Sequence, residues 1–239
     1  MIGHDDNVAL AMPTLDALKI TNFGDEYYYN TVENGFFWSF PEEELNSFKF
    51  RSPELVEDPT SILCLGCSAT MGTGVAYDET WPQQLGKELG CTAYNLGTQS
   101  GSGDSVYRFM RVWTPILKPK AIFVLIPRNP RRDLYDEKSN HWVPFGPYRP
   151  RNKYAEYSKK HFEILTSIHN TTMNSNMTYD AMVGFTHRNN VPIYFMDTQP
   201  IGEFTIDVAL DLLHPGPKTY KKYAELFKGM YLNDKIQNN

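Results

Sequence analysis

The chain has 239 residues, of which 41% are hydrophobic and 21% are charged, and its formal net charge at pH 7 is −5. This length and composition predict one medium-sized globular domain with an appendage, and they argue against a low-complexity protein. The negative charge argues against a large nucleic-acid-binding face, because phosphate recognition needs a basic surface.

Residues 1–58 are the least regular part of the sequence. They show weak periodicity and carry many aromatic side chains, among them the runs at 27–29 and 36–38. Their apolar content is too high for a disordered tail. We therefore predict an N-terminal extension over residues 1–58 that packs on the core, and a single folded domain over residues 59–239. Since no hydrophobic stretch follows Met1, we expect a soluble protein made in the cytoplasm, with no signal peptide and no membrane contact.

From residue 61 onward, short apolar runs alternate with segments of helical periodicity. Buried strands are predicted at residues 62–66, 92–96, 121–126 and 191–196. Helices are predicted at residues 81–89, 104–117, 154–188 and 218–232, and the polar run at 170–176 could break the third of them. This alternation predicts an α/β protein in which helices cover both faces of a parallel sheet, a three-layer α/β/α fold.

Ligands of such sheets bind beyond the carboxyl ends of the strands, so the residues that follow each strand are the candidates for a site. Ser68 follows the first strand, within Gly66-Cys67-Ser68-Ala69-Thr70. A sharp turn from strand to helix exposes a hydroxyl and directs the next N–H groups at one point, which favours a developing oxyanion. A serine that only caps the following helix is the alternative, and Ser68 alone would favour it.

A DxxH pattern, Asp211 to His214, precedes the last predicted helix. A serine hydroxyl is a weak nucleophile that needs a general base, and the base needs an acceptor that orients its other nitrogen. The pattern is weak by itself. Its place at the sheet end that also carries Ser68 makes His214 the candidate base and Asp211 its partner.

Three groups are candidates for an oxyanion hole. The loop over residues 95–104 offers the N–H of Gly101, the third strand is followed by the side-chain amide of Asn129, and Ser68 offers its own N–H. The loop could instead be a flexible connection or a phosphate cradle, although no Lys-Ser or Lys-Thr closes it as in a nucleotide P-loop. Asn129 next to Pro130 could instead be a simple turn.

Residues 127–153 are rich in Pro, Arg and aromatic residues, lack a clear period, and form a predicted loop whose length is typical of functional loops. Candidate substrate-binding residues there are Arg128, Arg131, Arg132 and Trp142. They suit an acidic or sugar-bearing substrate. The equally weighted alternative is that the arginines form surface ion pairs with Asp133, Asp136 and Glu137.

Cys64 and Cys67 form a CxxC, but no second Cys or His pair stands at zinc spacing. We therefore expect reduced cysteines, including Cys91, and no metal or cofactor.

Four blocks, GCS, NLG…SGSGD, PRNP and DLLHP, occur in the order and spacing of the SGNH/GDSL hydrolase superfamily, which the chain resembles from about Ser61 to Phe227. The resemblance implies a flavodoxin-like sheet, with Ser68, Gly101, Asn129 and His214 as signature positions and Asp211 as the third triad member. It implies acyl-ester hydrolysis without metal or cofactor. The G-x-S-x-G elbow of α/β-hydrolases is absent, because Thr70 stands at the second Gly.

The chain departs from the family pattern in two blocks. Cys67 replaces the Asp of Gly-Asp-Ser, so Cys67 is an alternative nucleophile, and Pro127-Arg128-Asn129-Pro130 replaces Gly-x-Asn-Asp. The expected function is that of a serine esterase that removes a small acyl group, such as acetyl, from a carbohydrate or similar small molecule through an acyl-enzyme on Ser68. The alternatives are an acyltransferase with the same site, or a non-catalytic binding or structural module of a larger assembly such as a viral particle.

Overall fold

The computed structural model describes residues 42–127, 131–136, 141–145, 167–197, 205–210 and 214–237. Its centre is a parallel sheet with strand order β2-β1-β3-β6. The strands are β1 (Ile62–Leu65), β2 (Ala93–Asn95), β3 (Ala121–Ile126) and β6 (Ile193–Asp197). Because all four run in the same direction, their carboxyl ends meet at one edge of the sheet.

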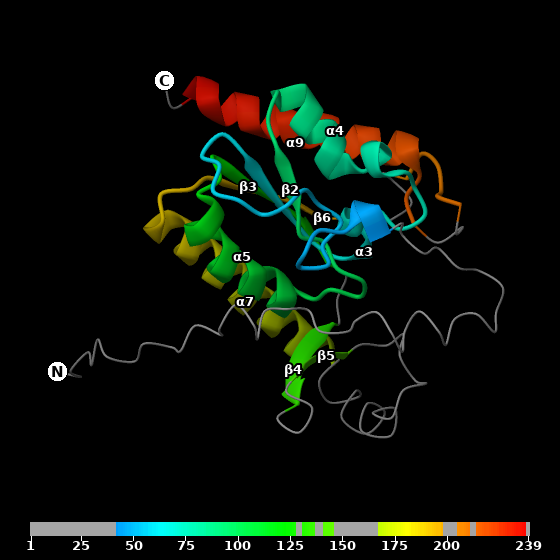
Figure 1. Cartoon of the computed structure of the whole chain (residues 1–239). Helices are drawn as coiled ribbons and strands as arrows, with labels where there is room; N and C mark the ends of the chain where they lie inside the picture. Colours follow the sequence, from blue (N-terminus) through cyan, green and yellow to red (C-terminus); the bar gives the residue numbers. More distant parts are fainter. Residues whose placement is uncertain are drawn as a thin grey trace.

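Helices cover both faces of this sheet, as Figure 1 shows. One layer contains α4 (Trp81–Leu89) and α9 (Pro217–Gln237), and the other contains α5 (Gly103–Leu117) and α7 (Ile168–Arg188). The predicted three-layer α/β/α fold is confirmed.

Alternate residues of the strands build one apolar layer on each face, because successive side chains of a strand point to opposite sides. Phe123 faces α9, where its ring lies 5.4 Å from that of Phe227. Its neighbours Ile122 and Val124 are fully buried on the other face, against α5 and α7. Such fully buried strands read as continuous apolar runs, which is why the sequence identified them.

The sequence did not predict a hairpin of β4 (Arg132–Asp136) and β5 (His141–Phe145), which pair antiparallel inside the expected loop. Its contacts to α5 are polar: Arg132 pairs with Asp104 at 2.6 Å, and Arg108 pairs with Asp133 at 2.8 Å. These strands therefore lack the regular pattern of apolar residues by which a strand is recognised in a sequence.

The polar run at residues 170–176, which could have broken this helix, does not break α7. The helix runs without interruption from residue 168 to 188, and the Ser167 side chain accepts the Asn170 N–H at its start. The predicted part over residues 154–166 lies outside the described ranges. The remaining short elements are the 3-10 turns η2 (Glu42–Glu44) and η3 (Tyr77–Glu79) and the one-turn helix α3 (Ser68–Met71).

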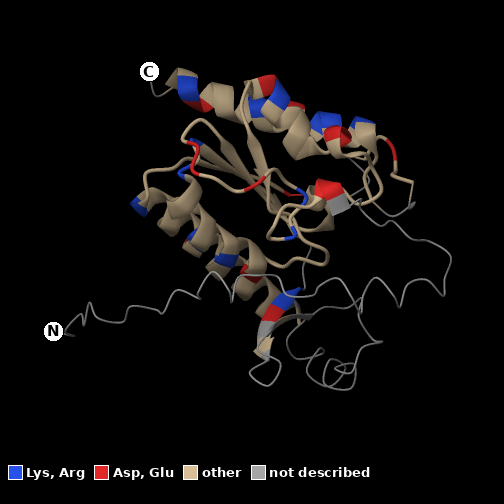
Figure 2. Ribbon diagram, viewed as in Figure 1, with Lys and Arg blue, Asp and Glu red and all other residues tan. Residues whose placement is uncertain are grey.

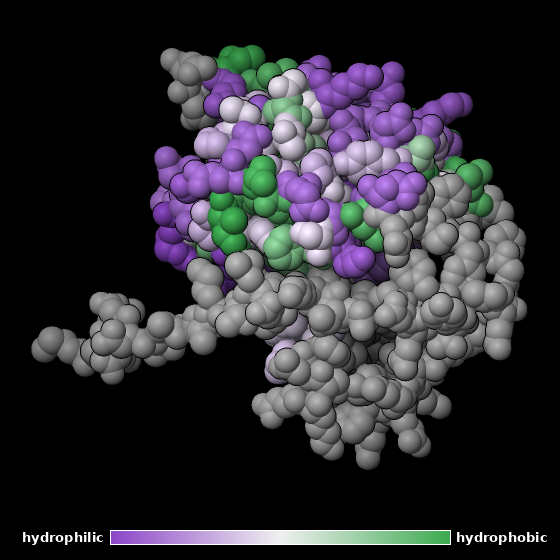
Figure 3. All heavy atoms as spheres, in the orientation of Figure 1, coloured by the Kyte–Doolittle hydropathy of each residue, from purple (hydrophilic) through white to green (hydrophobic). Residues whose placement is uncertain are grey.

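Acidic and basic residues are mixed along α4 and α9 (Figure 2). The face seen in Figure 3 is mostly hydrophilic over the described residues, with scattered hydrophobic side chains. Within the described ranges, no helix has both the length and the apolar character needed to cross a membrane.

Candidate active site

Ser68 lies at the carboxyl edge of the sheet, as the first residue of α3 directly after β1. Its Oγ lies 2.8 Å from Nε2 of His214, and Ser68 is only 6% exposed. The structure therefore brings these two predicted site residues together, although 146 positions separate them. An imidazole at this distance can accept the hydroxyl proton. Asp211 lies outside the described residues.

The start of α3 presents backbone N–H groups next to Ser68. The N–H groups of Thr70 and Met71 donate to the carbonyl oxygen of Cys67, at 2.9 and 3.0 Å. Among the residues that the structure describes, the N–H groups of Ser68 and Ala69 have no carbonyl acceptor. Two donors at the first turn of a helix can hold a negatively charged oxygen.

Gly101 lies beside this turn, but its N–H is occupied. That N–H donates to the carbonyl oxygen of Thr98 at 3.1 Å. A Cβ at Gly101 would lie 3.0 Å from the carbonyl oxygen of Gly66, two residues before Ser68. The Gly101 N–H is therefore not a free donor in this structure, because residues 98–101 close a turn on themselves. Asn129 lies outside the described residues.

The loop after β2 packs directly on α3 through Asn95 and Gly97. The Asn95 amide Nδ2 donates to the carbonyl oxygen of Thr70 at 2.8 Å, and its Oδ1 accepts the Gly97 N–H at 3.0 Å. A Cβ at Gly97 would lie 2.3 Å from the backbone nitrogen of Met71, so only glycine fits there. Sequence reasoning did not single out Asn95, although a polar residue ending a buried strand was an available signal.

Arg51, from the N-terminal extension, supports the other end of α3. Its side chain is 1% exposed and donates to the carbonyl oxygens of Gly72 at 2.7 Å and Val75 at 3.0 Å. Glu44 accepts from Nε of Arg51 at 2.7 Å, which balances the buried charge. A guanidinium has five N–H donors and can serve several such acceptors together. Sequence reasoning missed Arg51 because nothing periodic surrounds it.

Asp207, an acid that sequence reasoning passed over, fixes the segment that carries His214. Its carboxylate accepts the N–H groups of Lys218 at 3.0 Å and Thr219 at 2.8 Å, at the start of α9. Burial acts to raise the pKa of Asp207, but these hydrogen bonds outweigh it and hold the pKa below its usual value. The Ala209 N–H also donates to the carbonyl oxygen of His214 at 2.8 Å.

The three cysteines are free thiols. Burial raises the pKa of Cys64 well above its usual range, and burial also raises that of Cys91. Cys67 adjoins Ser68, but the His214 contact is to the Ser68 hydroxyl. Over the described ranges, no three His, Cys, Asp or Glu side chains are grouped as metal ligands.

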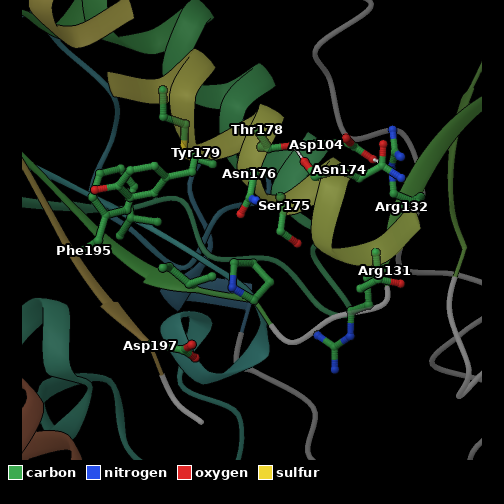
Figure 4. A pocket seen from close by; sticks show the side chains of 16 residues that line it. Asp104, Arg131, Arg132, Asn174, Ser175, Asn176, Thr178, Tyr179, Phe195 and Asp197 are labelled. Atoms are coloured by element: carbon green, nitrogen blue, oxygen red, sulfur yellow. Dashed lines mark hydrogen bonds and ion pairs between the residues drawn. The ribbon is translucent and has the colours of Figure 1, made fainter. Parts of the chain in front are cut away.

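Two of the candidate substrate-binding arginines, Arg131 and Arg132, contact α5 and the loop after β2. Arg132 pairs with Asp104 of α5, and Arg131 Nη1 donates to the carbonyl oxygen of Gly101 at 3.4 Å. Trp142 lies over Arg108, whose Cζ is 4.2 Å from the ring centroid. Arg131 and Arg132, but not Trp142, line a cavity of about 220 Å³ above β3 and β6 (Figure 4). Arg128 lies outside the described residues.

Neither a protein-family model nor a curated protein sequence matches the chain. Among solved structures, the chain is similar to the psychrotrophic esterase EstA from Pseudoalteromonas sp., with 15% identity and a TM-score of 0.40 over 75% of this chain and 100% of EstA. It is similar to the Clostridium thermocellum family 3 carbohydrate esterase, with 16% identity and a TM-score of 0.37 over 70% of this chain and 92% of that one. It is also similar to the acetyl xylan esterase Est2A from the rumen bacterium Butyrivibrio proteoclasticus, with 12% identity and a TM-score of 0.40 over 85% of this chain and 68% of Est2A.

Proposed function

We propose that this chain is a serine esterase of the SGNH/GDSL superfamily. The observation that carries the proposal is the 2.8 Å contact between Ser68 Oγ and His214 Nε2 at the carboxyl edge of the sheet. The sequence blocks support it, because three of the four contribute a residue at or beside this contact, namely Ser68, Gly101 and His214.

In the first half of the reaction, Ser68 Oγ attacks the ester carbonyl carbon while His214 Nε2 accepts its proton. The tetrahedral intermediate collapses to an acyl-enzyme, and His214 returns the proton to the departing alcohol oxygen. In the second half, His214 takes a proton from water, which attacks the acyl carbon and forms a second tetrahedral intermediate. When this intermediate breaks its bond to Ser68 Oγ and releases the acid, His214 returns the proton to Ser68 Oγ. Asp211 would accept from the other imidazole nitrogen and fix the tautomer that this sequence requires.

The oxyanion of both intermediates would be held by the N–H groups of Ser68 and Ala69 and by the Asn129 amide. The Gly101 N–H would join them only after releasing the carbonyl oxygen of Thr98. The acyl group proposed is small, such as acetyl, since Ser68 is only 6% exposed. The alcohol proposed is a carbohydrate or a similar small molecule.

The test is turnover of p-nitrophenyl acetate by the purified chain, by Ser68→Ala and by a control, Ser47→Ala. Ser47 is exposed and its hydroxyl binds Glu54, which makes it a matched serine outside the site. We expect Ser68→Ala to abolish turnover and Ser47→Ala to keep it. Equal turnover by all three proteins would exclude Ser68 as the nucleophile. An inactive chain that resists serine-directed phosphonates would favour a non-catalytic module.

A further inference from the structure

The first turns of α7 have a reversed polarity. Thr171, Asn174, Ser175 and Thr178 are partly buried on the side that faces the sheet. On the outer side, Met173 and Met177 are each 61% exposed. A surface helix normally buries its apolar residues and exposes its polar ones, as α7 does again from Met182, which is 5% exposed. The polar inner face therefore serves something other than core packing.

These inward side chains line the cavity of about 220 Å³ at the carboxyl ends of β3 and β6. In Figure 4, Tyr179 and Phe195 stand at one end of the cavity, Arg132 and Asp104 at the other, and Asn174, Ser175 and Asn176 between them. Val124 and Ile126 of β3 supply apolar lining. An apolar base with a few converging polar groups is the usual form of a small-molecule site.

One hydroxyl of this lining is buried, and the described part of the chain offers it no partner. Thr171 Oγ1 has no hydrogen-bond partner among the described residues. Leaving a buried hydroxyl unsatisfied costs stability, and a valine at the same place would avoid that cost. Because Thr171 also lines the cavity, a ligand bound there would supply the missing partner.

The charges around the cavity favour a neutral ligand. Asp104 and Asp197 balance Arg131 and Arg132, and Asp104 pairs with Arg132 at 2.6 Å. The other polar groups are amides and hydroxyls, which donate and accept and so match alcohol groups. The volume lies below the roughly 300–1,000 Å³ of pockets for drug-sized ligands, so it suits a single ring.

The cavity and the candidate active site lie at the same carboxyl edge of the sheet. Val124 of its lining is the register partner of Leu65, three residues before Ser68. Arg131 of its rim donates to the carbonyl oxygen of Gly101, which lies against Gly66. The cavity is therefore lined by β3, the direct neighbour of β1, and Ser68 follows β1 along the chain.

We propose that this cavity binds a neutral, polyhydroxylated ring, a sugar residue, as the alcohol part of the ester. The assignment of the ring as the alcohol part rests on the proposed function, whereas binding of the ring itself does not. Asn174 and Thr171 are the residues that select it.

The test measures binding of the methyl glycosides of glucose, mannose and xylose to the full chain carrying Ser68→Ala, by calorimetry at millimolar concentrations. Further variants in that background are Thr171→Val, Asn174→Leu and a control, Thr186→Val. Thr186 is buried on the same helix, but its hydroxyl binds the carbonyl oxygen of Met182 and lies outside the cavity.

We expect at least one glycoside to bind. Thr171→Val should weaken its binding about 2- to 10-fold, the loss of one hydrogen bond, and should leave the melting temperature equal or higher. Asn174→Leu should weaken binding more, and Thr186→Val should not change it.

Binding of none of the three glycosides, or equal binding by all variants, would overturn the proposal. A second readout compares kcat/KM of the Ser68 enzyme for a monoacetylated methyl glycoside and for p-nitrophenyl acetate. Asn174→Leu should lower the former more than the latter, because p-nitrophenyl acetate has no ring hydroxyls for Asn174 to bind. If Ser68→Ala retained esterase activity while Asn174→Leu still lost glycoside binding, the proposed function would fail and the sugar site would stand.

Discussion

The guanidinium of Arg51 and the carbonyl oxygen of Gly72 lie 2.7 Å apart. This contact ties the N-terminal extension to the end of the helix that begins at Ser68. Since α3 is only one turn long, its own hydrogen bonds hold it weakly, and the buried Arg51 side chain supplies the support.

Replacing Arg51 tests this support. Arg51→Met should destabilise the fold by about 3–5 kcal/mol, because it removes one partner of a buried ion pair. Urea unfolding measures this. Arg51→Met combined with Glu44→Gln should recover part of the loss, because no uncompensated carboxylate remains. In that double variant we expect kcat for p-nitrophenyl acetate to fall while KM changes little. An unchanged kcat would limit Arg51 to a structural role.

Asp207→Asn tests how the His214 segment is fixed. The variant should lose about 1 kcal/mol of stability at neutral pH, because asparagine keeps only one of the two oxygens that accept the N–H groups of Lys218 and Thr219. Because the folded-state pKa of Asp207 is lowered, its contribution is present above the unfolded pKa of about 3.9 and fades as the pH falls through the folded value. Thermal unfolding of both proteins should therefore show their stabilities converging below about pH 4. A pH-independent difference would contradict the hydrogen-bonded carboxylate.

Gly97→Ala tests the packing of the β2 loop on α3. Its Cβ would lie 2.3 Å from a backbone atom that cannot move aside, so we expect marked destabilisation and loss of esterase activity. Gly229→Ala in α9 is the matched control. Among the described residues, no atom outside the helix's own backbone lies within 4 Å of its added Cβ, and alanine in a helix should stabilise the protein by about 0.5–1 kcal/mol. Melting temperatures that shift equally in both variants would contradict the packing described.

Cys67→Ala separates the two neighbouring nucleophiles. Because His214 contacts the Ser68 hydroxyl, this variant should keep most of the p-nitrophenyl acetate turnover. Steady-state kinetics check this directly. Complete loss of turnover in a folded Cys67→Ala protein would favour Cys67 as the nucleophile.

Most of the central sheet could be predicted from the sequence, because β1 and β3 are buried on both faces and therefore appear as unbroken apolar runs. The meeting of Ser68 and His214 followed from a simple rule, that residues after parallel strands share one edge.

What escaped prediction depends on single polar contacts. The β4–β5 hairpin is held to α5 by ion pairs such as Arg108–Asp133, and Arg51 reaches its acceptor Gly72 across 21 positions of the sequence. The Gly101 N–H is turned away by one local hydrogen bond to Thr98. None of these contacts repeats with the period of a helix or strand, so no pattern in the sequence marks them.

The central claim is tested most directly by labelling the chain with a fluorophosphonate and locating the adduct by peptide mass spectrometry. The account predicts one adduct, on Ser68, that disappears in Ser68→Ala and persists in Cys67→Ala. An adduct on any other residue, or a native chain that stays unlabelled, would contradict it.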